Sequence, residues 1–361
     1  MKAINKDGFS IVFNHDGYEE LSNFILNQNF NKILILTDEN TKINCLDIFI
    51  TNIKSINGKI CEVFDSRVLN FSVKSGEHTK NIDTSLKIWK FLKESGFKRS
   101  DLIINLGGGM ITDLGGFVAS TFMRGIKFIN VPTSLLAMVD ASIGGKTGID
   151  FKEVKNLIGV FEFAKISLID LRFLKTLSKR QITSGYAEMI KHSLISDNSD
   201  WEKIRKIKSV KDISAEMIYE SIKIKILIIE KDPFESGVRK YLNYGHTLGH
   251  AIESKVLGSE KELLHGESIA IGIILESYIS YLKGGLGLEL VKNIKTHIKE
   301  HFKTTEFVSA DISKIIELLK FDKKNRDKEP MFVLLKGIGK PIINQTVREQ
   351  EIREAFNFYK D

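Results

Sequence analysis

The chain has 361 residues, of which 42% are hydrophobic and 27% are charged, and its formal net charge at pH 7 is +7. A chain of this length exceeds one usual hydrophobic core, so we expect two domains, and its balance of residue types excludes a disordered or fibrous protein. The two cysteines, Cys45 and Cys61, exclude a disulfide scaffold and fit a reducing compartment.

The first half of the chain alternates short apolar runs with helical patterns. Buried strands are expected at Lys32–Thr37, Ile60–Phe64, Leu102–Leu106 and Lys127–Val131, while Thr84–Ser95 has apolar residues at helical spacing. Strands and helices that alternate in this way predict a parallel sheet covered by helices. In such sheets, ligands bind at the carboxyl ends of the strands.

After about residue 170 the helical periodicity dominates, and Met331–Leu335 is the main run that is typical of a strand. We therefore predict an α/β domain at residues 1–170, followed by a mostly α-helical domain at residues 171–361. The helices expected in the second domain are Ser184–Ile195, Ala215–Glu230, Asn243–Val256, Glu267–Leu282 and Leu288–His301.

The sequence predicts a soluble protein of the cytoplasm. Its first residues lack the apolar core of a signal peptide, and no run of about 18 apolar residues could span a bilayer. The positive charge permits nucleic-acid binding, but the lysines are interleaved with acids and form no basic stripe, as in Ile204–Lys211. Anionic small molecules are therefore the expected partners, and nucleic acid is the weaker alternative.

A glycine-rich turn follows the expected strand Leu102–Leu106. Gly107, Gly108 and Gly109 stand between this strand and a helical pattern, where backbone N–H groups can approach a phosphate. The spacing is not that of the dinucleotide fingerprint G-x-G-x-x-G. The alternative interpretation is a tight strand-to-helix turn without a ligand.

A second glycine turn contains Gly144-Gly145-Lys146-Thr147. A P-loop requires a glycine where Asp140 stands, so that motif is excluded. A flexible turn that presents Lys146 and Thr147 still suits an anionic group, and Lys155-Asn156 adds a cation and an amide. The alternative is a surface loop with a solvated lysine.

Three polar side chains share one face of the expected helix Asn243–Val256. His246, His250 and Glu253 stand at positions i, i+4 and i+7, a pattern that indicates a metal or acid/base site. Buried structural histidines are the alternative. By helix geometry alone, His246 and His250 are the favoured pair of metal ligands.

Two further clusters offer metal-competent groups. His265 stands at the start of a long apolar helix, and Glu188 shares a helical face with Lys191 and His192. Zinc sites in enzymes often combine two histidines with one glutamate and leave a position open for water or substrate. Spacing alone does not select the ligands among these groups.

Taken together, these motifs resemble the 3-dehydroquinate synthase family, which belongs to the sugar phosphate cyclase superfamily. The matching blocks lie in order over most of the chain, with looser similarity before Asp38 and after Leu335. These blocks are Gly107–Asp113, Met123–Gly125, Val131–Ser134, Asp140–Thr147, Lys155–Gly159, Gly185–Lys191, Gly237–Glu253, His265–Glu267 and Asp322–Asn325.

The resemblance implies a Rossmann-like NAD-binding α/β domain, a helical metal- and substrate-binding domain, and an active site in the cleft between them. It implies that Glu188, His246 and His265 bind Zn²⁺ or Co²⁺, which replaces the pair chosen from helix geometry. His250 then becomes an acid/base or substrate-binding group beside the metal.

The resemblance also implies contacts for each ligand. The residues implied for NAD are Asp38, Gly76, Glu77, Lys80, Gly108, Gly109, Met110, Asp113, Thr133, Ser134, Lys146, Lys155, Phe173, Leu174, Lys175 and Thr176. The residues implied for the substrate are Asp140, Lys146, Lys155, Asn156, Lys191, Arg239, Asn243, Lys323 and Lys324. Arg124 is expected to reach across a homodimer.

The implied reaction converts 3-deoxy-D-arabino-heptulosonate 7-phosphate to 3-dehydroquinate and phosphate, a step of the shikimate pathway toward aromatic amino acids. It proceeds by transient oxidation with NAD, phosphate elimination, re-reduction and intramolecular aldol closure. NAD is regenerated in each turnover. The carboxylate and phosphate of the substrate account for the many cations, because Lys and Arg recognise such groups by charge-assisted hydrogen bonds.

Some residues depart from the family pattern. Val154 stands where glycine is common, Ser178 and Gln181 replace a usual proline and glutamate, and the segment Glu162–Ala164 differs from the usual one. These departures concern loop conformation rather than the metal ligands.

Two other enzyme classes share the architecture. Cyclases of sedoheptulose 7-phosphate tend to lose the second histidine of the Gly-His-Thr-x-Gly-His motif, whereas this chain keeps His250. A related metal-dependent alcohol or polyol dehydrogenase would consume NAD stoichiometrically, so NADH accumulation distinguishes it.

Overall fold

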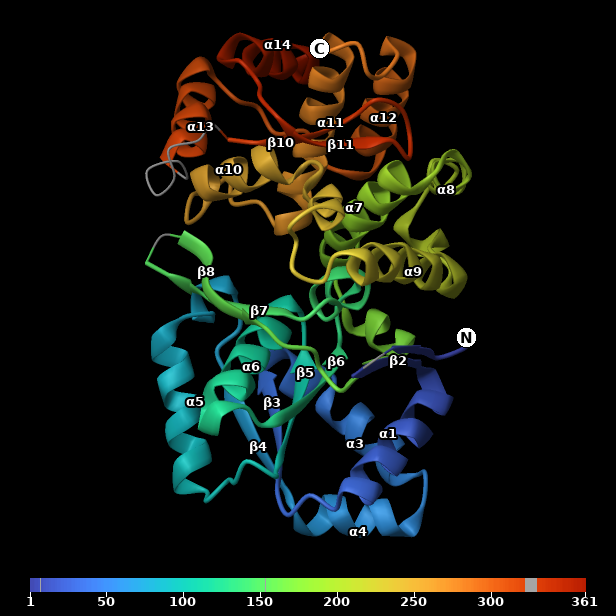
Figure 1. The fold of residues 1–361 in the computed structure, drawn as a ribbon, viewed down its shortest axis with the longest axis vertical. Coiled ribbons are helices and arrows are strands. Elements are labelled where there is room, and N and C mark those ends of the chain that lie inside the picture. Colours follow the sequence, from blue (N-terminus) through green and yellow to red (C-terminus); the bar gives the residue numbers. More distant parts are fainter. Residues whose placement is uncertain (7, 153, 322–329) are drawn as a thin grey trace. The chain divides into compact units, whose positions relative to one another are not determined.

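The computed structural model of the protein describes residues 1–6, 8–152, 154–321 and 330–361, and the predicted substrate residues Lys323 and Lys324 lie outside them. The chain forms two compact units, Met1–Ser178 and Lys179–Asp361 (Figure 1). The sequence placed the boundary at residue 170. The segment that follows residue 170 packs in the first unit, where the Leu171 N–H donates to Asn14 Oδ1 at 3.3 Å and Phe173 is fully buried.

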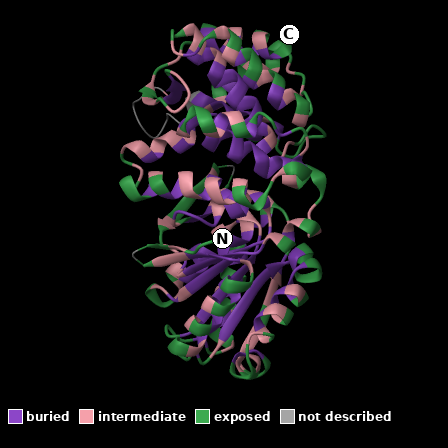
Figure 2. Ribbon diagram, turned by 90° about the vertical axis from the view of Figure 1, so that its right-hand side faces the viewer, coloured by how far each residue is buried: buried purple, intermediate pink, exposed green. Residues whose placement is uncertain are grey.

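A seven-stranded sheet is the centre of the first unit. Its strand order is β1-β2-β9-β6-β5-β3-β4, with β1 antiparallel to β2 and the other pairs parallel. Each residue of β3 and β5 is buried, as Val/Ile/Leu-rich strands of a covered parallel sheet should be (Figure 2). The strands are β1 (Ile4–Lys6), β2 (Phe9–Phe13), β3 (Ile33–Asp38), β4 (Val68–Val73), β5 (Leu102–Gly107), β6 (Lys127–Pro132) and β9 (Ile166–Ile169).

Helices connect the parallel strands of this sheet. Asparagine caps begin two of them, because the Asn57 side chain accepts from the Ile60 N–H and the Asn81 side chain from the Thr84 N–H. The helices are α1 (Asn14–Gln28), α2 (Glu39–Asn44), α3 (Leu46–Lys54), α4 (Gly58–Ser66), α5 (Ile82–Glu94) and α6 (Gly109–Thr121). Shorter turns of helix are η1 (Glu77–Thr79), η2 (Phe122–Arg124), η3 (Ala137–Ala141) and η4 (Leu171–Thr176).

The predicted strand Ile60–Phe64 is wrong, because this segment lies within the helix α4. Ile60 and Phe64 are both buried and stand at i and i+4, so they share one helical face, while Glu62 between them is exposed. The Asn57 cap starts the helix. The neighbouring strand is β4 instead.

A separate antiparallel hairpin contains β7 (Lys146–Phe151) and β8 (Val154–Phe161). Lys146 and Thr147, which the glycine turn was expected to present, begin β7, where Lys146 pairs with Phe161 and Thr147 with Val160. Two glycines let the strands approach: a Cβ on Gly159 would lie 2.4 Å from the Thr147 carbonyl oxygen. The glycines that precede β7 form the turn, with Gly144 and Gly145 at φ of 109° and 70°.

The second unit is mostly helical. Its helices are α7 (Lys179–Ser196), α8 (Asn198–Ile204), α9 (Ala215–Lys231), α10 (His246–Val256), α11 (His265–Leu282), α12 (Leu288–His301), α13 (Ser309–Phe321) and α14 (Glu349–Lys360). Two short turns of helix, η5 (Val210–Asp212) and η6 (Val238–Asn243), and an antiparallel pair, β10 (Phe332–Leu335) and β11 (Pro341–Gln345), complete it. The predicted fold class, an α/β domain followed by a helical domain, is confirmed.

The helix α11 is the core of the second unit. It contacts α7, α10, α12 and α14. Its residues from Ser268 to Ser277 are all buried, so it lacks the polar face of a surface helix. Among the described residues, no helix has the length and apolar character needed to cross a membrane.

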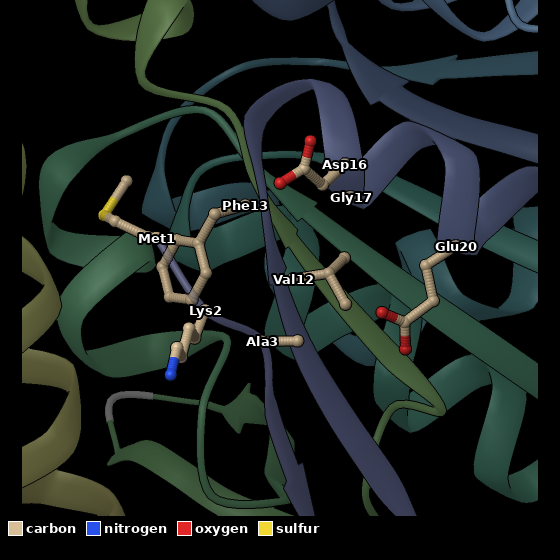
Figure 3. A pocket seen from close by; sticks show the side chains of 8 residues that line it. All are labelled: Met1, Lys2, Ala3, Val12, Phe13, Asp16, Gly17 and Glu20. Carbon is tan, nitrogen blue, oxygen red and sulfur yellow. The ribbon is translucent and has the colours of Figure 1, made fainter.

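A cavity of about 360 Å³ opens beside the N-terminal residues and α1, as Figure 3 shows. Met1, Val12 and Phe13 give it apolar walls, and the carboxylates of Asp16 and Glu20 lie at its edge. Its lining contains none of the residues predicted to bind NAD, metal or substrate.

Candidate active site

Predicted NAD-binding residues of the first unit follow the carboxyl ends of neighbouring parallel strands. β3 ends at Asp38, β5 leads into Gly108, and β6 leads into Thr133. The register pairs Gly107 with Pro132, so these ends meet at one edge of the sheet. There the Thr133 N–H donates to the Gly107 carbonyl at 2.9 Å.

Asp38 is buried and caps the helix α2. One carboxylate oxygen accepts from the N–H groups of Asn40 and Thr41 at 2.8 and 3.0 Å, and the Thr41 hydroxyl accepts from the Asp38 N–H in return. This capping box fixes the direction of the Asp38 side chain at the edge of the sheet. A second carboxylate oxygen remains to accept from a ligand hydroxyl.

The glycine turn Gly107–Gly109 begins the thirteen-residue helix α6. A Cβ on Gly107 would lie 2.5 Å from Ile111, and one on Gly109 would lie 3.3 Å from the Ala141 side chain. Gly108, the N-cap residue, offers no side chain to the first N–H groups of α6. The turn therefore presents backbone donors and the positive end of a helix, the arrangement that binds phosphate. Met110, predicted to contact NAD, lies in the first turn of α6.

A buried lysine collects three carboxylates next to this helix. Lys80 is 3% exposed, and its Nζ lies 2.6 Å from Glu77, 3.3 Å from Asp113 and 3.7 Å from Asp150. It also donates to Asn156 Oδ1 at 2.8 Å. Burial alone would lower the pKa of Lys80, but the three carboxylates outweigh burial and raise it. Four of these residues, all but Asp150, were predicted from the sequence to bind NAD or substrate.

The carboxyl of Asp113 is held in an unusual state by this cluster. Burial raises the pKa of Asp113 to about 6, Glu77 and Asp140 add to the rise, and Lys80 opposes it. Burial also raises the pKa of Asp150. The cluster therefore takes up protons when the chain folds in mild acid.

We predict that the free energy of unfolding of the unaltered protein, measured relative to that of Asp113→Asn, decreases as the pH rises from about 4 to about 6. The folded state keeps on Asp113 a proton that the unfolded chain has already released, so the folded state loses its advantage as the pH rises. A pKa that rises from about 4 to about 6 corresponds to about 3 kcal/mol. Urea unfolding of both proteins between pH 4 and pH 7 measures the effect, and identical pH profiles would contradict it.

The other residues predicted for NAD lie in two short segments. Gly76 has a φ of 102°, which an L side chain rarely adopts, and it precedes Glu77 in η1. Ser134 accepts from the Ala137 N–H at 3.2 Å. Four more of these residues lie in η4, namely Phe173, Leu174, Lys175 and Thr176.

Cys45 lies beside this predicted NAD surface, and the sequence did not identify it. Its buried sulfur is 3.6 Å from Thr176 Oγ1, and burial raises the pKa of the thiol. A protonated, buried thiol behaves as a small apolar group rather than a nucleophile.

The substrate residues predicted in the first unit occupy three places. Asp140 lies in η3, Lys146 begins β7 with its side chain exposed, and Lys155 and Asn156 stand on β8. Asn156 has a φ of 51°, and its N–H donates to Asp150 Oδ1 at 2.8 Å. Arg124, in η2, is exposed and also has a left-handed backbone, with a φ of 63°.

The three predicted metal ligands converge in the second unit. Glu188 comes from α7, His246 from the first residue of α10 and His265 from the first residue of α11. Glu188 Oε1 lies 3.4 Å from His246 Nε2 and 3.6 Å from His265 Nε2. The ligand atoms of His246, His250 and His265 lie within 4.8 Å of one another.

Hydrogen bonds fix which nitrogen of each imidazole faces Glu188. His246 Nδ1 lies 3.1 Å from the Tyr244 carbonyl, which can only accept, so Nδ1 carries the proton. His265 Nδ1 lies 3.4 Å from the buried carboxylate of Glu253 and donates to it. In the neutral form of each ring, which is the form that binds a metal, Nε2 therefore directs its lone pair toward the Glu188 carboxylate, which is 0% exposed. Three electron-pair donors at one point match a divalent cation, and a carboxylate or carbonyl behind each histidine is usual for metal ligands.

The electrostatics of this cluster agree with a cation site. Neither oxygen of Glu188 has a hydrogen-bond partner among the described residues, although Lys191 forms an ion pair with Oε2. Burial would raise the pKa of Glu188, but Lys191 and the two histidines outweigh it and hold the pKa well below the usual range. Burial would lower the pKa of His265, but the carboxylates of Glu188 and Glu253 outweigh burial and raise it to about 10. The same negative field attracts a metal ion.

Glycines bring the three helices close enough for the ligands to meet. A Cβ on Gly266 would lie 1.8 Å from the Ser184 carbonyl oxygen of α7, and one on Gly272 would lie 2.0 Å from the Gly245 oxygen. A Cβ on Gly249 would lie 3.2 Å from the Ser268 oxygen. The backbones of α7, α10 and α11 are thus in direct contact at the ligands.

Glu276 also positions the site, although no role was predicted for it from the sequence. It is fully buried on α11, and its carboxylate accepts from the N–H groups of Gly245 and Leu248 at 2.7 and 3.1 Å. It therefore caps α10, whose N-cap, Gly245, has no side chain to do so. Burial raises the pKa of Glu276 to about 8, although the backbone donors oppose the rise. The detectable signal was the one charged residue in the run from Ser268 to Leu282.

The other residues predicted for the active site in the second unit stand near Glu188 or His246 along the chain. Lys191 is one turn beyond Glu188 and 1% exposed. Arg239, in η6, is buried, and its N–H donates to Asp232 at 3.0 Å, while the Asn243 amide donates to Glu235 at 2.9 Å. The exposed ring of His250 lies 5.2 Å from that of His246 and 5.6 Å from that of His265, measured between centroids.

Comparisons with known proteins point to one enzyme family. Two family models match in succession: 3-dehydroquinate synthase N-terminal over residues 70–184 and 3-dehydroquinate synthase C-terminal over residues 185–325. A 3-dehydroquinate synthase from Parabacteroides distasonis is 38% identical over 358 residues, which are 97% of this chain and 98% of the relative.

Solved structures of sugar phosphate cyclases have the same fold. A 2-deoxy-scyllo-inosose synthase, complexed with carbaglucose-6-phosphate, NAD⁺ and Co²⁺, has a TM-score of 0.82 at 25% identity and covers 97% of this chain and 96% of its own. A 2-epi-5-epi-valiolone synthase from Streptomyces hygroscopicus subsp. jinggangensis, with NAD⁺ and Zn²⁺ bound, has a TM-score of 0.81 at 22% identity and covers 100% and 99%.

Proposed function

The chain belongs to the 3-dehydroquinate synthase family, and we propose that it converts 3-deoxy-D-arabino-heptulosonate 7-phosphate to 3-dehydroquinate and phosphate. The observation that carries the proposal is the convergence of the Glu188 carboxylate with His246 Nε2 and His265 Nε2 in the second unit. A two-histidine, one-carboxylate set leaves coordination positions for a substrate.

NAD and a divalent metal, Zn²⁺ or Co²⁺, are the cofactors. When bound, NAD supplies a hydride acceptor that is restored within the turnover, and the metal supplies a Lewis acid for the substrate hydroxyls. Glu188, His246 and His265 would hold the metal. Asp38, the N-terminus of α6 and the cluster around Lys80 would hold NAD, because they offer a carboxylate for hydroxyl groups and backbone donors for phosphates.

The chain's own residues would supply the remaining chemistry. Lys146, Lys155, Lys191 and Arg239 are cations of the kind that recognise a phosphate and a carboxylate. His250 is exposed next to the ligand imidazoles, so it is the group we propose to move a proton to and from the substrate. The buried Lys191 pairs with Glu188 and helps to hold the pKa of the Glu188 carboxyl well below its usual range.

Two alternatives within the same architecture are less well supported. A 3-dehydroquinate synthase is 38% identical over 97% of this chain, whereas the 2-epi-5-epi-valiolone synthase is 22% identical, and His250 is present. A stoichiometric alcohol dehydrogenase would release NADH and would need no phosphate-binding cations.

We predict that the NAD- and metal-loaded protein releases phosphate from the heptulosonate phosphate without net accumulation of NADH. Chelation should abolish phosphate release, and added Zn²⁺ or Co²⁺ should restore it. A coupled assay measures free phosphate and absorbance at the NADH band in one cuvette. Steady NADH formation with a simple alcohol, and no phosphate release, would support the dehydrogenase instead.

We also propose that the protein acts in the cytoplasm as a homodimer. Both cysteines are unpaired, which fits a reducing compartment. Arg124, which the family pattern assigns to a neighbouring subunit, lies beside the exposed Met123 in a segment with left-handed backbone. A small anionic metabolite as the substrate requires no nucleic acid or membrane partner.

A further inference from the structure

A second group of metal-competent side chains lies at the end of α12. His297, Glu300 and His301 stand at i, i+3 and i+4, so they share one helical face. Each offers a ligand atom, and these atoms all lie within 4.8 Å of one another. His297 is buried, whereas Glu300 is exposed and His301 is half-exposed, so an ion can enter from solvent. None of the three belongs to the proposed active site.

The tautomer of His301 follows from its backbone contact. Its Nε2 lies 3.0 Å from the carbonyl oxygen of Ile207, which can only accept a hydrogen bond. Nε2 therefore carries the proton, and Nδ1 of the neutral ring keeps its lone pair. A carbonyl behind a histidine, accepting from its second nitrogen, is the usual support of a metal ligand.

His297 is fixed in the same tautomer by a second contact. The Tyr186 hydroxyl donates its one hydrogen to the Ile204 carbonyl at 3.0 Å, so toward His297 Nε2, at 2.8 Å, it accepts. Nε2 carries the proton, and Nδ1 is left with its lone pair. The buried Trp201 packs edge-to-face against the His297 ring, at 5.6 Å between centroids, and holds its plane.

The local charges favour a cation, with two opposing lysines, of which Lys179 acts on His301. α12 ends at His301, where the unpaired carbonyls of its last turn give a negative helix end. Glu300 adds a carboxylate. Lys208 opposes, because its Nζ lies 4.0 Å from Glu300 Oε2, but its side chain is 77% exposed and can turn into solvent.

We propose that His297 Nδ1, His301 Nδ1 and the Glu300 carboxylate bind a second divalent transition-metal ion, of the Zn²⁺ class, with water in the open position. Two imidazoles and a carboxylate suit Zn²⁺, whereas Mg²⁺ and Ca²⁺ select oxygen ligands. Through Tyr186 and the Ile204 and Ile207 carbonyls, the ion would tie the end of α12 to α7 and to the chain around α8. Its role is structural, and it does not depend on the proposed reaction.

Equilibrium dialysis of the untagged, NAD-loaded holoenzyme against Zn²⁺, with metal content measured by mass spectrometry, tests the proposal. We expect two ions per chain, one of which is weaker. His301→Ala and Glu300→Ala, which change solvent-accessible side chains, should reduce the weaker affinity at least about tenfold and leave phosphate release unchanged. His15→Ala, on the exposed surface of α1, is the matched control with two ions retained.

Lys208→Ala tests for the ion itself, because helix packing without a bound ion predicts no change in Zn²⁺ affinity. Removing this charge should tighten the weaker Zn²⁺ site about threefold, a modest effect because the lysine is exposed. One ion per chain in the unaltered protein, or two ions of unchanged affinity in His301→Ala, would overturn the proposal. If the unaltered protein bound both ions but released no phosphate, the result would count against the proposed reaction and not against this site.

Discussion

Replacing His246 by alanine is expected to remove the catalytic metal and to reduce phosphate release by about a thousandfold or more. The substitution leaves Glu188, which is 0% exposed, and His265 as two ligands where three converged. Activation by a bound metal contributes several kcal/mol to such reactions, which is the size of the expected loss. Metal content after dialysis against a weak chelator, together with the phosphate assay, measures both consequences.

His250→Ala is the informative companion of this variant. Its ring is exposed and lies as near to His246 as the ring of His265 does, whereas Nε2 of His246 and Nε2 of His265 lie 3.4 and 3.6 Å from Glu188 Oε1. We expect this protein to keep its metal and to lose turnover. Equal metal loss in His246→Ala and His250→Ala would show that the pair on α10 holds the ion and that the assignment of Glu188 and His265 is wrong.

Gly266→Ala is expected to destabilise the second unit by about 3 kcal/mol or more and to lower its metal content. The added Cβ would lie 1.8 Å from the Ser184 carbonyl oxygen, and a backbone atom cannot move aside as a flexible side chain can. Because Gly266 follows His265, any shift of α11 away from α7 separates His265 from Glu188. Urea unfolding and metal analysis of the same preparation measure the two effects.

Gly287→Ala serves as the matched control in the same unit. Gly287 precedes α12 with a φ of −74°, and a Cβ there would meet nothing within 4 Å. Its effect on unfolding should stay within about 0.5 kcal/mol. If Gly266→Ala unfolded at the urea concentration of the control and kept its metal, close helix contact would not be what positions His265.

Much of the fold was predictable because local patterns and tertiary packing agree in it. Leu288–His301 has the bounds expected from its apolar spacing, and β5 and β6 each extend one residue beyond their predicted ends. The strand at Ile60–Phe64 failed because a short apolar run fits a strand and one face of a helix equally well, and Asn57 decided between them. The hairpin β7–β8 was missed because its glycines indicated a loop.

The candidate site was predictable only in part from the residues themselves. Spacing on one helix suggested His246 with His250, because periodicity compares positions on the same element. Glu188 and His265 join through contacts between helices, which no spacing within one segment reveals; the family resemblance named them. Glu253 shared a helical face with the histidines, but its carboxylate lies behind His265 as a hydrogen-bond acceptor.

The three proposed metal ligands come from three different helices, which would have a consequence for the protein in the cell. An unfolded chain has no preformed cage for the ion, so every increment of metal affinity adds to the stability of the second unit, by about 2.7 kcal/mol at a hundredfold excess over Kd. When zinc is scarce, newly made chains would spend more time open to proteases. The amount of enzyme would then follow the zinc supply even at constant synthesis.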